Sequence, residues 1–309
     1  MPNTQIPVHP EQSPRLASHF GVLVRDDVAL TNNKGVEKGG IRKRTEQALE
    51  KLQEPLRKFL EPDEAVFYIA RAQIMPSGVE QFFLGWHAMF LAPAVLVFTN
   101  RRLLHLLVER NGKWKRSLRS TRWGDVEEAK AKGFLGARLQ IKYRDGKKEI
   151  YSAMARNDAN KIQLLLETLL PAAAGETSPA LAPTSLCPEC RSPLSPGVYE
   201  CPQCRMGFKN EKTALQRSWL IPGGGFFYTG HSLLGILHGI VEVILLFTVA
   251  FWLLVVFGVA YSKPNPGEAP MDMASALVIV ALVGGILAVD KWVMATVARK
   301  QVRNYIPVS

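Results

Sequence analysis

The apolar last third of the chain constrains the fold more than any other feature. From Ser218 to Tyr261 there is no Lys or Arg, Glu242 is the only acidic residue, and a second apolar run extends from Ala274 to Val289. A helix needs about 20 residues to cross the hydrocarbon core of a bilayer. The sequence therefore predicts two membrane spans, at about 240–261 and 273–296, behind a water-soluble front.

The charges that flank the two apolar runs predict the orientation of the hairpin. Basic residues precede the first run and follow the second, whereas the loop between them carries Lys263 with Glu268 and Asp272. Because Lys and Arg concentrate in cytoplasmic flanks, we predict an integral protein of a bacterial inner membrane with both termini in the cytoplasm. Within the membrane region, 209–309, the break at Pro222 predicts an interfacial or re-entrant segment over 219–239.

Four ionisable residues fall at similar depth near the cytoplasmic ends of the predicted spans. Such groups are costly in hydrocarbon, and they usually pair with one another or carry function. One interpretation is an ion pair between Glu242 and Lys291 that sets the register of the hairpin. The other is a proton or ion path, which two spans would form only as an oligomer. The cluster consists of His238, Glu242, Asp290 and Lys291.

The membrane region also carries a glycine and aromatic signature. It reads Pro222-Gly-Gly-Gly-Phe-Phe-Tyr-Thr-Gly230, with Leu234-Gly235 next and Asp290 late in the second span. This pattern resembles the small two-span membrane proteins with an aromatic-Tyr-x-Gly sequence before their first helix. The resemblance covers about Trp219 to Val297, and it implies a topology rather than a chemical activity.

The only cysteines form two Cys-x-x-Cys pairs, Cys187-Pro-Glu-Cys190 and Cys201-Pro-Gln-Cys204. Four thiolates at this spacing favour tetrahedral metal coordination, and in the cytosol a metal is expected rather than disulfides. Residues 186–208 resemble a minimal zinc ribbon, although Arg191 and Arg205 stand where a Gly often follows each pair. The resemblance implies zinc in a structural role, because four Cys leave no open coordination position.

The soluble front is predicted to be one domain, residues 41–170, between a disordered or loosely ordered segment (1–40) and a linker (171–185). The order is an amphipathic helix, Ile41–Leu60, then short β-rich segments with Asn111-Gly112 and Asp145-Gly146 turns, then a closing helix, Asn157–Leu170. We also consider a strand at Phe20–Val24. The predicted strands are Ala65–Ala70, Ala94–Phe98, Leu103–Glu109, Lys113–Trp123, Arg138–Arg144 and Lys147–Ala153.

One stretch within this domain carries a family resemblance. Val95-Leu-Val-Phe-Thr-Asn-Arg-Arg-Leu103, a basic strand, Trp123-Gly-Asp-Val126 and the closing helix resemble a bacterial pleckstrin-homology-like domain over about Glu64 to Leu170. The resemblance implies a bent β-barrel with a C-terminal helix, and a binding module rather than an enzyme. The whole chain is then a multidomain α+β protein. The aromatic run Phe82–Phe90 departs from the pattern, and we expect a core strand there, with a membrane-dipping loop as the alternative.

Most of the net charge of +11 lies in this domain, with 15 basic and 5 acidic residues between Asn100 and Lys148. Period-2 alternation would place Lys113, Lys115 and Arg119 on one face of a strand. A basic face of this kind either binds an anionic leaflet or a protein partner, or only keeps the domain soluble. The candidate binding residues are Arg101, Arg102, Lys113, Lys115, Arg119, Lys142 and Arg144.

The chain shows no nucleophile–base pair, phosphate loop or carboxylate dyad, so we predict that it is not an enzyme. The leading hypothesis is a membrane-anchored binding or adaptor protein that contacts membrane lipid and an unidentified protein partner. The alternative is a subunit of an oligomeric channel or transport complex, a homo-oligomer built through the hairpin. A nucleic-acid tether ranks third, since the ribbon lacks a basic and aromatic stripe.

Overall fold

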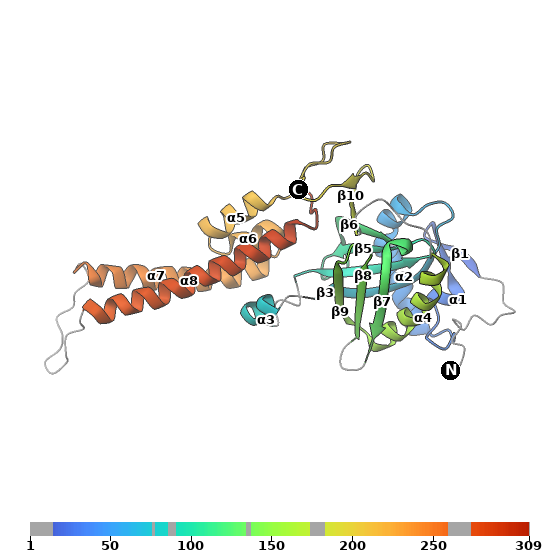
Figure 1. Cartoon of the computed structure of the whole chain (residues 1–309), viewed down its shortest axis with the longest axis horizontal. Helices are drawn as coiled ribbons and strands as arrows, with labels where there is room; N and C mark the ends of the chain where they lie inside the picture. The colour runs from blue at the N-terminus through green and yellow to red at the C-terminus, as the bar shows by residue number, and fades with distance from the viewer. Residues whose placement is uncertain are drawn as a thin grey trace. The chain divides into compact units, whose positions relative to one another are not determined.

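The computed structural model describes residues 15–75, 78–85, 91–133, 137–173, 183–258 and 273–308 (Figure 1). The chain divides into two compact units. The first holds Met1–Ser77, Met89–Gly207 and Asn304–Ser309, and the second holds Gly78–Ala88 and Phe208–Arg303.

The first unit is built on seven strands in two antiparallel meanders. β3 pairs with β4, β4 with β5 and β5 with β6, while β7 pairs with β8 and β8 with β9. β9 also pairs with β3, which joins the two meanders into one sheet. The strands are β3 (Val66–Ile74), β4 (Pro93–Thr99), β5 (Arg102–Val108), β6 (Trp114–Arg122), β7 (Val126–Lys132), β8 (Ala137–Tyr143) and β9 (Lys148–Met154).

These strands confirm the six predicted from the sequence within a few residues at each end, and β7 was missed. The burial of β7 alternates as in a half-exposed strand, but its small Ala129 and Ala131 make that alternation weak in sequence. Gly112 (φ 86) and Gly146 (φ 84) occupy the predicted hairpin turns in the left-handed region that glycine tolerates.

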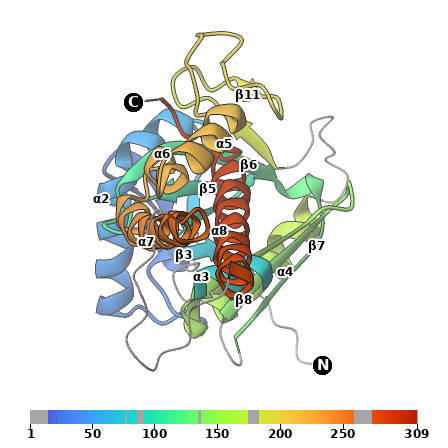
Figure 2. The ribbon, with the colours of Figure 1, turned by 90° about the vertical axis from the view of Figure 1, so that its left-hand side faces the viewer.

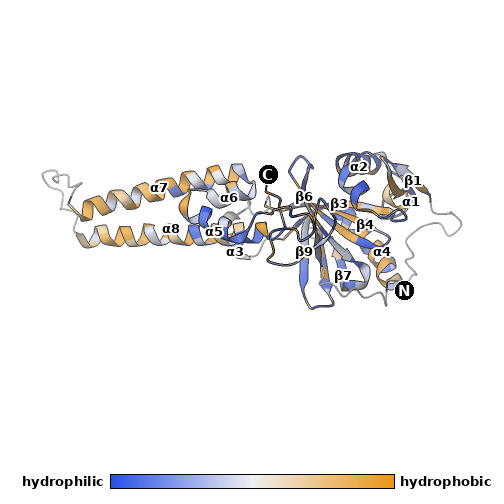
Figure 3. Cartoon of the chain, turned by 90° about the horizontal axis from the view of Figure 1, so that it is seen from above, coloured by the Kyte–Doolittle hydropathy of each residue, from blue (hydrophilic) through white to orange (hydrophobic). Residues whose placement is uncertain are grey.

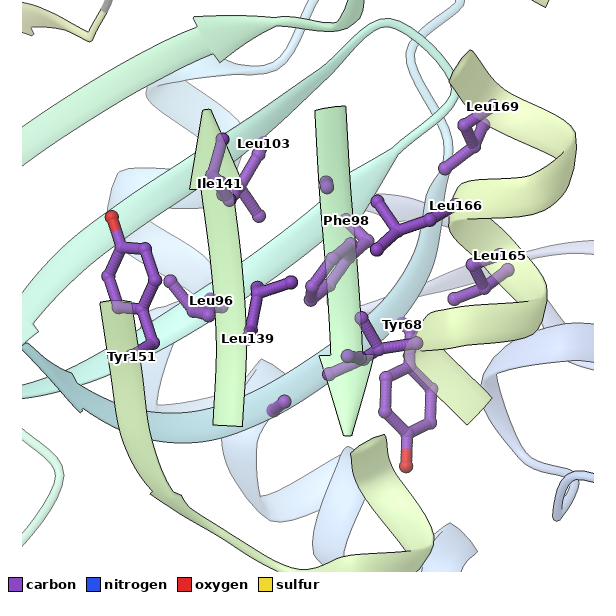
Figure 4. Packing of buried hydrophobic residues seen from close by; sticks show 14 of the residues in the cluster. Tyr68, Leu96, Phe98, Leu103, Leu139, Ile141, Tyr151, Leu165, Leu166 and Leu169 are labelled. Atoms are coloured by element: carbon purple, nitrogen blue, oxygen red, sulfur yellow. The ribbon is translucent and has the colours of Figure 1, made fainter. Parts of the chain in front are cut away.

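Two helices cover the sheet and define two hydrophobic cores. α4 (Arg156–Ala172) contacts β7 and β8 and buries Ile162, Leu165 and Leu166 in one core. Figure 4 shows Leu165 and Leu166 pointing from α4 toward the sheet. α2 (Gly39–Phe59) buries Leu49 and Leu56 with residues of β2 to β6. Each such Leu contributes on the order of 1.5–3 kcal/mol through burial. Both helices confirm the predicted apolar stripes.

The N-terminal segment corrects a prediction. Residues 15–38 were expected to be loosely ordered, yet β1 (Leu16–His19) and β2 (Val22–Arg25) form a hairpin that continues into α1 (Asp26–Ala29). β2 pairs in parallel with β3, and the buried Lys161 ammonium of α4 donates to Thr31 Oγ1 (3.0 Å) and Asn32 O (3.1 Å). These contacts order the segment, whereas residues 1–14 lie outside the described part of the chain.

The cysteine region is part of the same sheet. β10 (Thr184–Leu186) pairs antiparallel with β6, with Ser185 opposite Arg119, and β11 (Pro193–Leu194) pairs with β10. We predicted a linker up to residue 185 and a separate rigid spacer after it. Instead, residues 184–186 extend the sheet, and the ribbon continues from its edge (Figure 2).

The second unit is helical. It comprises α3 (Gly78–Leu84), α5 (Glu211–Leu220), α6 (Gly224–Thr229), α7 (Ser232–Val256) and α8 (Met273–Val302). α7 and α8 are long and apolar enough to cross a membrane, and many of their apolar side chains are exposed. Figure 3 shows both helices mostly in the hydrophobic colour. α7 begins eight residues before the predicted span at 240, so the later part of the predicted interfacial segment is helical.

The described start of the aromatic run Phe82–Phe90 is helical and does not form the core strand that we expected. Its first residues belong to α3, and Phe82 keeps 81% of its surface exposed. Residues 86–90 lie outside the described part of the chain.

Candidate metal centre and buried polar clusters

The two cysteine pairs come together in one cluster. All four Sγ atoms lie within 4.8 Å of one another, and none is in a disulfide. Cys187 Sγ is 3.5 Å from Cys204 Sγ, and Cys190 Sγ is 3.4 Å from Cys201 Sγ. A tetrahedral site with metal–sulfur bonds of about 2.3 Å has sulfurs about 3.8 Å apart. The cluster therefore fits a single metal ion held by four thiolates.

Each cysteine pair folds as the same backbone turn. Arg191 N–H donates to Cys187 O (3.0 Å) and Arg205 N–H to Cys201 O (2.9 Å). In both turns the Arg adopts a left-handed conformation, with φ of 65° at Arg191 and 57° at Arg205. These are the two positions where glycine was expected, and the turn imposes the glycine-like geometry on an L-residue.

One hydroxyl lies against two of the sulfurs. Ser192 Oγ is 2.9 Å from Cys190 Sγ and 3.1 Å from Cys201 Sγ. A hydroxyl donor beside thiolates stabilises their negative charge and orients them toward a bound ion. Sequence spacing gave no reason to select Ser192.

The end of the chain packs on the ribbon. Tyr305 O–H donates to Ser195 O (2.5 Å), Val308 N–H donates to Gly207 O (3.1 Å), and the rings of Tyr305 and Tyr199 lie 5.9 Å apart. Ser117 Oγ of β6 also donates to Asn304 O. Residues 304–308 are thus a part of the ribbon that the cysteine pattern could not predict.

The Thr-x-x-Arg-Leu turn that suggested the family resemblance is a buried structural cluster. Arg102 donates through Nε and Nη2 to the two carboxylate oxygens of Glu64, at 2.9 Å and 2.7 Å, and through Nη2 to Phe59 O (2.7 Å). Thr99 donates its hydroxyl to Glu64 (2.7 Å) and accepts from Arg102 N–H (3.0 Å). Arg102 therefore joins α2 to the β4–β5 turn, and it is not free for a ligand.

Arg119 also belongs to the interior rather than to a basic face. Arg116 has a positive φ of 55°, and the β5–β6 register shifts between Leu106 and Val108, which marks a β-bulge. The shift adds two residues to β6, so the alternation is kept across the bulge, and Trp114 and Leu118 both pack in the core beneath α2. Arg119 points to the other face of β6, which is the interior of the sheet and not solvent.

The side chain of Arg119 sits in a polar network inside the sheet. It donates to Glu149 (2.6 Å) and to Nδ1 of His105 (3.0 Å), while the hydroxyls of Tyr143 and Tyr151 donate to Glu149 at 2.8 Å and 2.7 Å. Burial alone would raise the pKa of Glu149, but Arg119 and the tyrosine hydrogen bonds outweigh it and lower that pKa to about 2. Burial, together with Arg119, holds the pKa of His105 well below its ordinary value.

The remaining predicted basic residues lie at the surface. Arg101 pairs with Glu61 and Asp63, Lys142 pairs with Glu127, and Arg144 donates to Gly124 O (2.7 Å). Lys113 is exposed and Lys115 half-buried. The seven residues therefore do not form one basic surface, because four of them have carboxylate partners within their own domain.

The polar cluster of the second unit contains the ion pair expected between the two long helices. Lys291 Nζ lies 2.5 Å from Glu242 Oε2. The same ammonium donates to Ser218 O (3.0 Å) at the end of α5, and Gly223 N–H donates to Glu242 (3.2 Å). The pair therefore joins α7 and α8 and also anchors the turn between α5 and α6.

The second polar pair of this cluster is looser. His238 Nδ1 lies 3.5 Å from Asp290 Oδ1, and the ring of Phe226 is 5.0 Å from that of His238. Asp290 also borders a shallow apolar groove of about 450 Å³ along α8, lined by Ala281, Leu282, Gly285, Ile286 and Val289.

Glycines allow α5, α6 and α7 to pack this closely. A Cβ on Gly223 (φ 67) would lie 2.0 Å from Gly235 O, and one on Gly235 would lie 2.8 Å from the ring of Phe227. The Pro222-Gly-Gly-Gly225 segment is therefore a tight turn that no larger residue can form here.

Comparison with known proteins assigns the chain to no family. No family model matches the chain, and no curated protein matches it.

Proposed function

We propose that the chain is a membrane-anchored, non-enzymatic binding protein whose sheet unit binds a protein partner at a cytoplasmic membrane surface. The observation that carries this proposal is the position of the ribbon. β10 extends the sheet, and the ribbon holds Gly207, which precedes the apolar hairpin, against Val308, which follows it. Both ends of the hairpin therefore leave from one element that is continuous with the sheet.

The proposed ion in the ribbon is zinc, held by the four thiolates with Ser192 beside two of them. Zinc prefers four sulfur ligands in structural sites, and a filled coordination sphere has no position for water or substrate. Its role here is to fold the ribbon.

The proposed class of the sheet unit is the pleckstrin-homology-like fold. The meander from β3 to β9, the pairing of β3 with β9 and the cover of β7 and β8 by α4 support a bent barrel closed by its C-terminal helix. Binding is the role that this resemblance implies.

A protein partner is favoured over an anionic leaflet because the predicted basic surface is largely paired internally. Arg102 and Arg119 are mostly buried on carboxylates, and exposed ion pairs such as Arg101 with Glu61 attract headgroups less than free cations would. Lys113, Lys147 and Lys148 are exposed at hairpin ends, with Lys147 beside Asp145, and we take them as the candidate residues for contact with a partner.

The proposed anchor is the α7–α8 hairpin with both chain ends in the cytoplasm. The largely exposed apolar faces of these helices and the basic residues Arg299, Lys300 and Arg303 after the apolar part of α8 support this orientation. The alternative is a subunit of an oligomeric channel or transport complex. The apolar groove beside Asp290 supports it, because a carboxylate within a membrane usually pairs with another polar group, which a second copy of the chain could supply.

Amine-reactive crosslinking in intact cells tests the function. We expect a discrete adduct with another protein that is lost when Lys113, Lys147 and Lys148 are changed to Gln and kept when exposed Lys43 of α2 is changed to Gln. Adducts only with aminophospholipids would favour the leaflet. A ladder of self-adducts that survives the triple substitution would favour the oligomeric alternative.

A further inference from the structure

The connection between β3 and β4 is far longer than neighbouring antiparallel strands require. β3 ends at Ile74 and β4 begins at Pro93, whereas a hairpin loop takes about 2–5 residues. Part of this connection, α3, belongs to the helical unit and packs with α8. Long excursions from a compact sheet usually serve a function.

An ion pair between a buried carboxylate of α3 and a half-exposed ammonium of α8 sets the level of α3 along α8. The carboxylate of Glu80 is buried, and its Oε2 lies 2.7 Å from Lys300 Nζ. Lys300 is four residues beyond the predicted end of the second span at 296, which is about 6 Å along a helix. The headgroup region of each leaflet is about 5–8 Å thick. If α8 crosses a bilayer, α3 therefore lies at the level of the lipid headgroups.

The other side of α3 presents an aromatic ring outward. Phe82 follows Glu80 by two residues, about 200° around the helix axis, and it keeps 81% of its surface exposed. Leu220 at the end of α5 is likewise 80% exposed in this unit. Aromatic side chains concentrate at the boundary between headgroups and acyl chains.

We infer that α3 is a third membrane contact of this protein, which lies on the surface of the bilayer and inserts Phe82 between phospholipids. This inference rests on the proposed insertion of α7 and α8. It assigns to the β3–β4 connection a lipid contact of its own, in addition to the two long helices.

Photocrosslinking of the full chain in phosphatidylcholine vesicles with a minor fraction of phosphatidylglycerol tests the inference. The photoreactive residue p-benzoylphenylalanine replaces Phe82, Phe247 or Phe20, one at a time. Phe247 is 73% exposed in the middle of α7 and reports on membrane insertion, whereas Phe20 is 41% exposed in the β1–β2 turn of the sheet unit.

We expect lipid adducts at position 82 that exceed those at position 20 several-fold and approach those at position 247. Adducts at 247 but not at 82 would overturn the inference and leave the membrane anchor standing. A lack of adducts at 247 would overturn the anchor itself. Adducts at 82 mainly with a second copy of the chain would make α3 a protein interface and also overturn the inference.

Charge exchange tests the docking of α3 on α8. Glu80→Lys should reduce the lipid adducts at position 82 several-fold because Lys300 then repels α3. Adding Lys300→Glu should restore them, since the exchanged pair can form again. Adducts that are unaffected by Glu80→Lys would show that this ion pair does not set the position of α3, which would remove the argument for its level.

Discussion

Arg191 and Arg205 each adopt the left-handed backbone conformation, which is unfavourable for a residue with a side chain. Each has a positive φ in the turn after a cysteine pair, where an L-residue is less favourable than glycine by roughly 1 kcal/mol. The turn is nevertheless held by the N–H of each Arg, which bonds to the first cysteine of its pair. The strain is therefore tolerated because these hydrogen bonds and the packing of the four cysteines fix the turn.

We predict that Arg191→Gly or Arg205→Gly raises the free energy of unfolding of the zinc-loaded chain by roughly 0.5–1 kcal/mol. Arg191→Ala is the matched control, because it removes the side chain and keeps the strain, and it should be nearly neutral. Gly197→Ala, at a φ of 80° in open space, should be destabilising. Chemical denaturation in mild detergent measures all four, and equal effects of Gly and Ala at 191 would contradict the strain argument.

The Arg119–Glu149–His105 network predicts a specific response to acid. The pKa of His105 is lower in the folded than in the unfolded state, so the unfolded chain gains a proton first as the pH falls below about 6.5. The pKa of Glu149 falls from 4.5 to about 2 on folding, so a second loss follows below about 4.5. Stability of the sheet unit should therefore decrease in two steps, the second of about 3 kcal/mol.

Hydrogen exchange of peptides from β5 and β9, corrected for intrinsic rates, measures this response. The step below about 4.5 should vanish in Glu149→Gln, which should also destabilise the unit by about 3 kcal/mol at neutral pH, since it leaves Arg119 without a charged partner. A profile for Glu149→Gln that retains the lower step would show that other carboxylates cause it.

Among the elements, the strands and helices with regular apolar periodicity could be predicted from the sequence. The prediction was wrong or incomplete for β6, β10 and α3, whose structure depends on tertiary contacts. β6 has an exposed bulge at Arg116, and the face that carries Arg119 is the interior of the sheet, which the sequence of one strand cannot indicate. β10 is three residues long and pairs with β6, whose partner residues (118–120) lie far earlier in the chain, which local pattern cannot indicate. α3 contains the start of an aromatic run that also suits a strand, and its packing on α8 is a tertiary contact that local pattern does not show.

The candidate site residues could be predicted where their partners lie close in sequence or on evenly spaced helices. Two Cys-x-x-Cys pairs define a metal cluster by themselves, and Glu242 and Lys291 could be aligned because helices advance evenly along the chain. Glu64 and Glu149, which neutralise Arg102 and Arg119, lie far away in sequence. The pairing of a charged residue depends on tertiary structure, and so the basic surface was overestimated.

The α5–α6–α7 element depends on glycines that have no room for a side chain. We predict that Gly235→Ala destabilises the helical unit by about 2 kcal/mol or more, because its methyl group would overlap the ring of Phe227. Gly284→Ala on α8, where a Cβ meets nothing within 4 Å, should be neutral or slightly stabilising. Thermal unfolding in detergent compares the two, and equal effects would show that α6 does not pack against α7 in solution.

On the scale of the whole molecule, the ribbon links folding of the metal site to the two ends of the hairpin. Metal binding and folding are one process in small thiolate sites, because the ligands do not stay together without the ion. Here the ribbon also carries Tyr305 and Val308, which follow α8, and β10, which extends the sheet. Loss of the metal should therefore release residues far from the cysteines in sequence.

We predict that a chelator, or Cys201→Ser, increases hydrogen exchange in residues 184–208 and equally in 304–308, while β3, β4 and α4 stay protected by their own core. Tyr305→Phe is the control that frees the tail and leaves the cysteines intact. It should raise exchange at 304–308 without loss of bound metal. If chelation left the tail protected, the tail would be held by the sheet through Ser117 rather than by the ribbon, and the metal would stabilise the ribbon alone.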